Sequence, residues 1–195
     1  MRMTTYVLHG GESSRKSADN ELFFRQFTAL VKKESVKILI CYFARSKEKW
    51  LTQFSIDNNN ISLQTNKKTS VSMVDDSDDL MNKLPYADVV YISGGEQEFI
   101  EPYIPKLSML KQLLNQKIYI GSSLGAFLIS PHYVLSLEGQ DTKTVYTGLG
   151  IIPYNVLCHW NIEKNKEEKV AMLKKKDPET PILLIDEEKF KIITI

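Results

Sequence analysis

The sequence predicts a single α/β domain built on an open, mostly parallel sheet with helices on both faces. Two observations lead to this fold class. Short runs rich in Val, Ile and Tyr, nearly unbroken by polar residues, alternate with helical patterns along the chain, and strands buried on both faces of a parallel sheet have this composition. The length of 195 residues is normal for one domain, so we expect residues 1–195 to form one unit.

The elements follow from these patterns in chain order. Buried strands are expected at 5–8, 36–43, 89–92 and 118–121. A helix is expected to carry Phe24, Phe27 and Val31 on one stripe and to close at Lys32 and Lys33. Further helices are predicted over 47–54, before a polar turn at 57–60, and then over 76–84, in parts of 97–115 and over about 164–175. Short strands are predicted at 132–137 and 144–146 around a turn at 138–141, and at 182–185 and 190–195 around a turn at 186–188.

The charge balance and the apolar pattern exclude several classes of function. Lys+Arg 25 against Asp+Glu 24 gives a net charge of +1, which argues against binding nucleic acid by neutralising phosphates. The longest apolar run, 38–44, is too short to span a bilayer, and the first residues contain no apolar signal segment. Cys41 and Cys158 lie in strand-like runs rather than in a disulfide framework. We therefore expect a cytoplasmic protein without a nucleic-acid or membrane partner.

The most informative segment is 117–126, Lys-Ile-Tyr-Ile-Gly-Ser-Ser-Leu-Gly-Ala. An apolar strand leads into glycines that flank Ser123 at Gly-x-Ser-x-Gly spacing. A nucleophile elbow has this pattern because small neighbours let the backbone turn sharply from strand to helix and expose the hydroxyl. The alternative is a helix-starting loop in which Ser122 or Ser123 only caps the helix. The preceding strand favours Ser123 as a nucleophile.

A serine nucleophile needs a base, and the chain contains 3 histidines, His9, His132 and His159. His159 ends the apolar run 156–158, and a strand end can face the site of an α/β sheet. His9 follows the first strand, whereas His132 is close in sequence to Ser123. Each of them alone is explained as a hydrogen-bonded structural residue. With the elbow present, His159 is the preferred base.

A carboxylate that orients the imidazole completes such a site. The candidates are Glu138, Asp141 and Asp186. Glu138, in the turn after the elbow, is preferred, although a solvated turn residue explains it nearly as well.

Glycine turns after strands bring backbone N–H groups close to a ligand. Ser93-Gly94-Gly95 follows one predicted strand, and the N–H groups of Gly95 and Leu124 are the candidate oxyanion hole for a tetrahedral intermediate. An ordinary turn between strand and helix explains Gly95 equally well, and His9-Gly10-Gly11 is a further turn of this kind. The sequence contains no phosphate-binding loop and no paired Cys/His spacing for zinc, so no metal and no organic cofactor is expected.

Together these motifs resemble peptidase E, the aspartyl dipeptidases within the class I glutamine amidotransferase-like superfamily, over most of the chain. Residues 121–126 resemble the family's Gly-x-Ser-Ala-Gly-Ala elbow, with Ser123 as the nucleophile. Ser93-Gly94-Gly95 is similar to the start of its Gly-Gly-Asn-Thr motif, and 147–153 to its Gly-Leu-Gly segment. Cys158-His159 looks like the family's histidine after the next strand, and Glu138 falls where the family tends to carry its acidic partner.

The resemblance implies a flavodoxin-like, glutamine amidotransferase-like fold. It also implies a serine peptidase, an exopeptidase or dipeptidase that hydrolyses small peptides with an N-terminal aspartate. The expected partners are such a peptide and a second copy of the chain in a homodimer.

Two loops beside the expected site depart from the family pattern. Leu124 replaces alanine, and Glu96-Gln97 replace Asn-Thr. An aspartyl side chain needs a cation, yet no arginine follows Arg45, which leaves Lys143, Lys164 or an arginine of an early loop. Because lysine offers only a point charge and Glu96 adds a negative charge, we expect the preference for Asp over Asn to be modest.

Two other functions fit parts of the sequence. One is an α/β-hydrolase esterase with His9-Gly10-Gly11 as the oxyanion turn, against which the short spacing from elbow to His159 argues. The other is a non-catalytic binding or regulatory module of the same fold, favoured by the charge of Glu96 beside an anionic intermediate.

Overall fold

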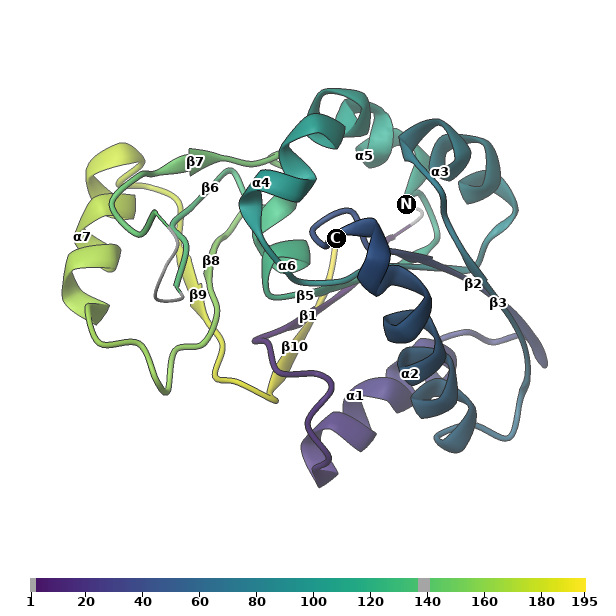
Figure 1. Cartoon of the computed structure of the whole chain (residues 1–195). Coiled ribbons are helices and arrows are strands. Elements are labelled where there is room, and N and C mark those ends of the chain that lie inside the picture. Colours follow the sequence, from purple (N-terminus) through teal and green to yellow (C-terminus); the bar gives the residue numbers. More distant parts are fainter. Residues whose placement is uncertain (1–2, 137–140) are drawn as a thin grey trace.

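A six-stranded sheet forms the centre of the computed structural model, which describes residues 3–136 and 141–195 (Figure 1). The strand order is β10-β1-β5-β4-β2-β3. The parallel strands are β1 (Thr5–His9), β5 (Ile118–Ser122), β4 (Val89–Ile92), β2 (Ser35–Cys41) and β3 (Lys68–Met73). The edge strand β10 (Phe190–Thr194) pairs with β1 in antiparallel fashion. The predicted fold class, a single α/β domain with an open, mostly parallel sheet, is confirmed.

Helices cover both faces of the sheet (Figure 1). One face carries α1 (Ala18–Ala29) and α2 (Trp50–Leu63). The other carries α3 (Ser77–Lys83), α4 (Gln97–Ile100), α5 (Leu110–Leu113) and α6 (Leu124–Leu128). The 3₁₀ segments are η1 (Lys47–Lys49), η2 (Leu84–Tyr86) and η3 (Glu101–Met109). Pro105 lies inside η3, and because proline lacks the N–H of an α-helical bond, α4 and α5 are separate short helices.

Two small sheets and α7 (Lys166–Lys176) extend the domain beyond β10 (Figure 1). The strands predicted at 132–137 and 144–146 are shorter than expected, because β6 (His132–Tyr133) and β7 (Tyr146–Thr147) pair over only two residues each. Residues 138–140 of the predicted turn lie outside the described residues. The segments around the turn at 186–188 pair with different partners. β9 (Ile182–Leu184) runs parallel to β8 (Asn155–Leu157), whereas β10 joins the main sheet.

The chain leaves β2 and β4 in opposite directions. From β2 it passes through α2 to the edge strand β3, and from β4 it passes through α4 and α5 to β5 on the other side. A ligand-binding crevice lies outside the carboxyl ends of the strands at such a switch point. The carboxyl edge of the sheet, near β4 and its neighbours, is therefore where a site is expected.

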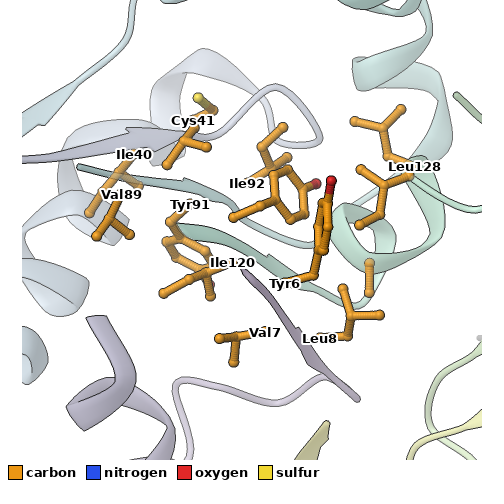
Figure 2. Close-up of a cluster of buried hydrophobic side chains, with 14 of the residues drawn as sticks. Tyr6, Val7, Leu8, Ile40, Cys41, Val89, Tyr91, Ile92, Ile120 and Leu128 are labelled. Atoms are coloured by element: carbon orange, nitrogen blue, oxygen red, sulfur yellow. The ribbon is translucent and has the colours of Figure 1, made fainter. Parts of the chain in front are cut away.

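The core lies between the sheet and its helices, and it explains the unbroken apolar runs of the strands. Figure 2 shows side chains of β1, β2, β4 and β5 packed together, among them the fully buried Val7, Leu8, Ile40, Val89, Tyr91, Ile92 and Ile120. Phe27 of α1 packs edge-on against Tyr91, with ring centroids 5.1 Å apart. Central strands covered on both faces need apolar residues at every position.

The end of α1 differs from the prediction. The helix stops at Ala29, so Val31, Lys32 and Lys33 lie beyond it. Val31 is nevertheless buried in the core, which explains why the apolar stripe continued past the end of the helix.

The prediction of a turn at 57–60 is wrong, because α2 continues through these residues to Leu63. Asp57 and Ile61 are both fully buried on the inner face of this helix. The Asp57 carboxylate accepts hydrogen bonds from Tyr42 Oη at 2.8 Å and from Gln53 Nε2 at 3.0 Å. These tertiary contacts stabilise the helix across a polar stretch whose intrinsic helix propensity is low.

The strand β3 was not predicted. Its sequence, Lys-Thr-Ser-Val-Ser-Met, alternates between exposed and half-buried residues. Alternation is typical of a strand at the edge of a sheet, whereas the prediction rested on unbroken apolar runs.

We predict that Asp57 makes the fold less stable as the pH rises. Burial raises the pKa of this carboxyl from 3.8 to about 6, so the folded protein binds more protons than the unfolded chain between these values. The contribution of Asp57 is complete below the lower pKa and is lost as the pH passes the higher one. Urea unfolding between pH 4 and pH 7 should show the wild type losing free energy of unfolding relative to Asp57→Asn. If the difference in free energy of unfolding between the wild type and Asp57→Asn does not change with pH, this prediction is contradicted.

Candidate active site

Ser123 stands at the junction of β5 and α6 in a backbone conformation that is rare for a residue with a side chain. Its φ is 49° and its ψ is −111°, and such geometry persists only where the surroundings enforce it. The Ser123 N–H donates to the carbonyl of His9 at 2.9 Å. The Ser123 carbonyl accepts from the N–H groups of Ala126 and Phe127 at 2.8 and 3.0 Å. The neighbouring strand and the first turn of α6 thus fix the elbow.

The flanking glycines are required by close backbone contacts. A Cβ atom at Gly121 would lie 2.5 Å from the carbonyl oxygen of Gly125, and one at Gly125 would lie 2.0 Å from that of Ile92. Both distances are shorter than a van der Waals contact. The Gly-x-Ser-x-Gly spacing therefore reflects the packing of α6 against β4 and β5.

The imidazole of His159 lies between Ser123 and Glu187. Its Nε2 is 3.0 Å from Ser123 Oγ, and its Nδ1 is 2.8 Å from Glu187 Oε1. Because an ionised carboxylate only accepts hydrogen bonds, Nδ1 carries the proton and Nε2 accepts from the Ser123 hydroxyl. His159 is 2% exposed and Glu187 is 8% exposed. In this arrangement the imidazole can remove the proton of the serine.

The turn after β1 contacts both the backbone and the ring of His159. The His159 N–H donates to the carbonyl of Gly10 at 3.0 Å, and a Cβ at Gly11 would lie 2.2 Å from His159 Cε1. His9-Gly10-Gly11, the turn that an esterase would need for its oxyanion hole, thus packs against the base.

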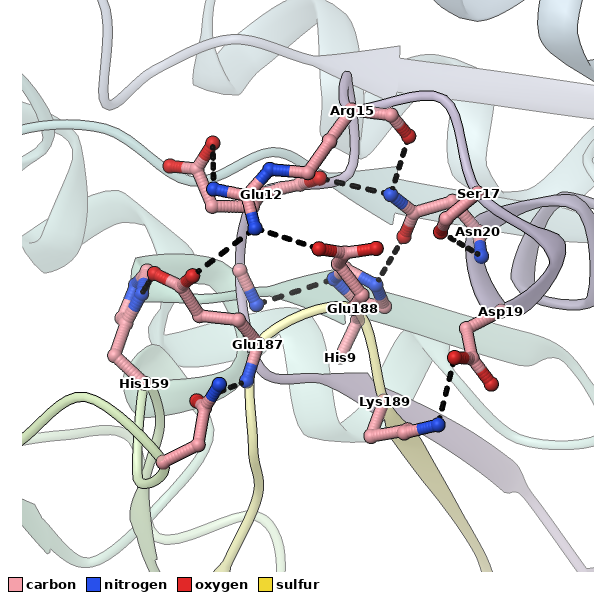
Figure 3. A network of polar contacts seen from close by, with 12 residues as sticks. His9, Glu12, Arg15, Ser17, Asp19, Asn20, His159, Glu187, Glu188 and Lys189 are labelled. Carbon is pink, nitrogen blue, oxygen red and sulfur yellow. Dashed lines mark hydrogen bonds and ion pairs between the residues drawn. The ribbon is translucent and has the colours of Figure 1, made fainter.

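Glu187 is held by its own partners (Figure 3). Its N–H donates to Asn161 Oδ1 at 2.8 Å, and its Oε2 lies 3.4 Å from Arg15 Nη1. The same Arg15 nitrogen is 2.6 Å from Glu188 Oε1. These contacts leave Oε1 of Glu187 directed at the imidazole.

Glu138, the carboxylate that the sequence analysis preferred, lies outside the described residues. Within the described residues, Nδ1 of His159 already has a carboxylate partner in Glu187. Asp186, one of the alternatives, precedes it directly, and its carbonyl oxygen would be 2.0 Å from a Cβ at Gly10. Glu187 was not predicted from the sequence as the partner of His159. Its one available signal was an acidic residue just before the final strand.

The other histidines are placed differently. His9 is fully buried, with Nε2 2.9 Å from Asn20 Oδ1 and Nδ1 3.1 Å from Ser122 Oγ. Burial lowers the pKa of His9 to about 4, so its ring is neutral at pH 7. His132 lies on β6 in a small sheet, where its N–H donates to Asn155 Oδ1 at 2.9 Å.

The turn 93–95 after β4 lies against the elbow because its glycines have no side chains. A Cβ at Gly94 would be 2.9 Å from Ser123 Cβ, and one at Gly95 would be 1.9 Å from the Ala44 carbonyl oxygen. Gly95 and Leu124, the candidate oxyanion donors, thus belong to the two segments that meet at Ser123.

Glu96 is exposed and lines an acidic cavity of about 410 Å³. Glu98, Glu101 and Asp141 line the same cavity. The residues that line this cavity include neither Ser123 nor His159.

Within 3–136 and 141–195, no group of three or more His, Cys, Asp or Glu side chains is arranged to hold a metal ion. No helix in the same part of the chain is long and apolar enough to cross a membrane.

The fold and the site define an α/β protein with a serine nucleophile elbow and an imidazole–carboxylate pair, the arrangement of a serine hydrolase. A family model supports a more specific assignment. The model of peptidase family S51 matches residues 7–194, and the chain therefore belongs to this family. The resemblance to peptidase E is confirmed.

Individual relatives are distant. An uncharacterized peptidase of Listeria monocytogenes is 29% identical over 98 residues, which are 46% of this chain and 48% of that protein. The match thus spans about half the length of this curated relative. A peptidase from an acI-B1 actinobacterium has a TM-score of 0.63 at 17% identity over 98% of this chain and 84% of its own. A Listeria monocytogenes EGD-e protein assigned to peptidase E also has a TM-score of 0.63, at 19% identity over 99% and 98%. These structures share the fold.

We predict that Gly125→Ala destabilises the protein by about 3 kcal/mol, because the new methyl group overlaps the Ile92 carbonyl and α6 must move. Gly150→Ala is the matched control. Gly150 has a φ of 57° but no atom within 4 Å of its Cβ position, so its cost should be about 1 kcal/mol, from the backbone conformation alone. Chemical denaturation of both variants measures the difference. Equal losses of unfolding free energy in the two variants would show that the overlap with the Ile92 carbonyl adds no cost.

We predict that Glu187→Gln lowers kcat for a peptide substrate about 10³- to 10⁴-fold with little change in KM, because the imidazole loses the acceptor that fixes its tautomer. Glu188→Gln is the matched control, since Glu188 also bonds Arg15 without touching His159, and it should keep nearly full turnover. Glu138→Gln tests the carboxylate preferred from the sequence. A large loss in Glu138→Gln together with normal turnover in Glu187→Gln would reverse the assignment.

Proposed function

We propose that the protein is a serine peptidase that hydrolyses small peptides after an N-terminal acidic residue. The observation that carries this proposal is the unbroken hydrogen-bonded series from Ser123 Oγ through the His159 ring to Glu187. Membership of peptidase family S51 supports a peptide as the substrate. The proposed location is the cytoplasm, which agrees with the free, buried thiols of Cys41 and Cys158.

In the first half of the proposed reaction, Ser123 Oγ attacks the carbonyl carbon of the scissile bond. Nε2 of His159 takes the hydroxyl proton, and Glu187 stabilises the resulting imidazolium through Nδ1–H. The carbonyl oxygen becomes an oxyanion, for which the N–H groups of Gly95 and Leu124 are the proposed donors. His159 then gives its proton to the leaving amine, and an acyl-enzyme remains on Ser123.

In the second half, water replaces the amine. Nε2 of His159 takes a proton from the water as its oxygen attacks the acyl carbon, and it returns the proton to Ser123 Oγ as the acid leaves. The first and the last of these proton transfers use the 3.0 Å contact between Ser123 Oγ and Nε2 of His159, and the other two run between Nε2 and the leaving amine or the water.

The second candidate function is a binding or regulatory module without turnover. The observation that favours it is the charge of Glu96, which directly follows the turn 93–95 that lies against Ser123, because negative charge beside the elbow opposes an anionic intermediate. Labelling with a serine-directed phosphonate separates the two functions. A catalytic elbow is labelled once per chain, and an inactive one is not labelled.

We predict that Ser123→Ala abolishes both labelling and hydrolysis, with turnover falling by at least about 10³-fold, because the attacking oxygen is lost. The fold should be unchanged, since the removed hydroxyl contributes little packing. Ser122→Ala is the control, because Ser122 points to His9 at 3.1 Å instead of to His159. Normal turnover in Ser123→Ala with none in Ser122→Ala would mean that Ser122 is the nucleophile.

A further inference from the structure

Arg45 is a partly buried arginine at the carboxyl end of β2, in the segment that follows this strand. Its Nε donates to the Ser93 hydroxyl at 3.3 Å. Among residues 3–136 and 141–195, no carboxylate lies within 4 Å of the guanidinium, although Arg15 and several lysines have such partners. The buried carboxylate of Asp57 acts on Arg45 only at longer range and is bonded to Tyr42 and Gln53.

Arg45 and Ser123 both contact the turn 93–95. Ser93, which accepts the Arg45 hydrogen bond, is 1% exposed and begins the turn 93–95. The same turn contacts Ser123 through Gly94 and the Ala44 carbonyl through Gly95. Arg45 and Ser123 therefore flank one short backbone segment.

The topology supports a ligand at this place. β2 and β4 are hydrogen-bonded neighbours, and they are the strands from which the chain departs in opposite directions (Figure 1). The crevice of an open α/β sheet lies outside the carboxyl ends of such a pair. Arg45 follows the end of β2 and Ser93 follows the end of β4, so both residues lie at the sheet edge where this crevice is expected.

A partly buried guanidinium without a carboxylate partner has lost hydration and has gained only one weak hydrogen bond. Its planar fork of N–H groups matches a carboxylate in bidentate geometry. We propose that Arg45 is the specificity residue that binds a carboxylate of the peptide substrate. The inference rests on the proposed function and adds the group that selects the substrate.

A substrate offers this carboxylate from two sources, the side chain of an acidic N-terminal residue or the free C-terminus of a dipeptide. Four compounds separate them. Asp-Ala amide carries only the side-chain carboxylate, Asn-Ala amide is its neutral counterpart, Ala-Ala has only the terminal carboxylate, and Ala-Ala amide has neither. The comparison is made with wild type, Arg45→Met, Arg45→Lys and Arg25→Met. Arg25 is an exposed arginine on α1 and serves as the control.

Arg45→Met keeps the stem of the side chain. It also keeps the backbone contacts, in which the Arg45 N–H donates to Tyr42 and the Arg45 carbonyl accepts from Trp50 Nε1 at 2.9 Å. We expect kcat/KM for the carboxylate-bearing compound to fall about ten- to hundredfold in Arg45→Met, mostly through KM, while its uncharged counterpart changes little. Arg45→Lys should recover part of the loss, and Arg25→Met should match the wild type.

Selective loss for Asp-Ala amide identifies the side chain as the source, and selective loss for Ala-Ala identifies the C-terminus. Equal losses for charged and neutral compounds, or no loss for either, overturn the assignment while leaving the peptidase function intact. Binding of the same compounds to Ser123→Ala and to Ser123→Ala combined with Arg45→Met, measured by calorimetry, does not depend on turnover. If wild type hydrolyses none of the peptides, the proposed function fails. Arg45-dependent binding of a carboxylate compound would then still support the inference, and its absence would overturn it.

Discussion

The direct contact of backbone segments at the carboxyl edge of the sheet is the constraint on which the site depends. The turn after β1 lies under the ring of His159, and the turn after β4 lies against Ser123, both at glycines. The Ser123 N–H closes this arrangement with a bond to the carbonyl of His9. Side chains on these turns would separate the nucleophile from its base. The hydroxyl and the imidazole are therefore positioned mainly by main-chain packing, which holds groups more rigidly than long side chains do.

Rigid positioning also explains the polar groups buried beneath the site. His9 bonds Asn20 and Ser122, and Asn20 Nδ2 in turn donates to the carbonyls of Glu12 and Arg15. A buried polar group is stable only where its hydrogen-bonding capacity is used. The network fixes the loop after β1 at both ends, and this loop presents Gly11 to the base and Arg15 to Glu187.

The elements that could be predicted from the sequence are those with a clear local pattern. The buried parallel strands were predicted from composition, and the elbow with Ser123 from a spacing that the packing of Gly121 and Gly125 explains. His159 was preferred because it follows a strand, and the structure brings it to Ser123. In contrast, Glu187 lies within the acidic run 186–188, where no local signal distinguishes one carboxylate from the next.

The elements missed by the sequence analysis depend on contacts between distant parts of the chain. Glu187 reaches His159 because β10 pairs with β1 across the whole length of the chain. The second half of α2 is helical because Asp57 meets Tyr42. The edge strand β3 is ordered by pairing with β2. Periodicity and composition describe neighbours in sequence and contain little information about such pairings.

The antiparallel edge strand β10 has a consequence for the timing of catalytic competence. The strands that carry the nucleophile and the base precede residue 160, but Glu187 is held between β9 and β10 and bonds to Asn161 through its N–H. A ribosome delivers the chain from its N-terminus, so most of the sheet can form while the Glu187 carboxylate is still in the exit tunnel. The imidazole–carboxylate pair of His159 and Glu187 can therefore form only after the strands that position Ser123 and His159 have been made, so its assembly is a late step of folding during synthesis.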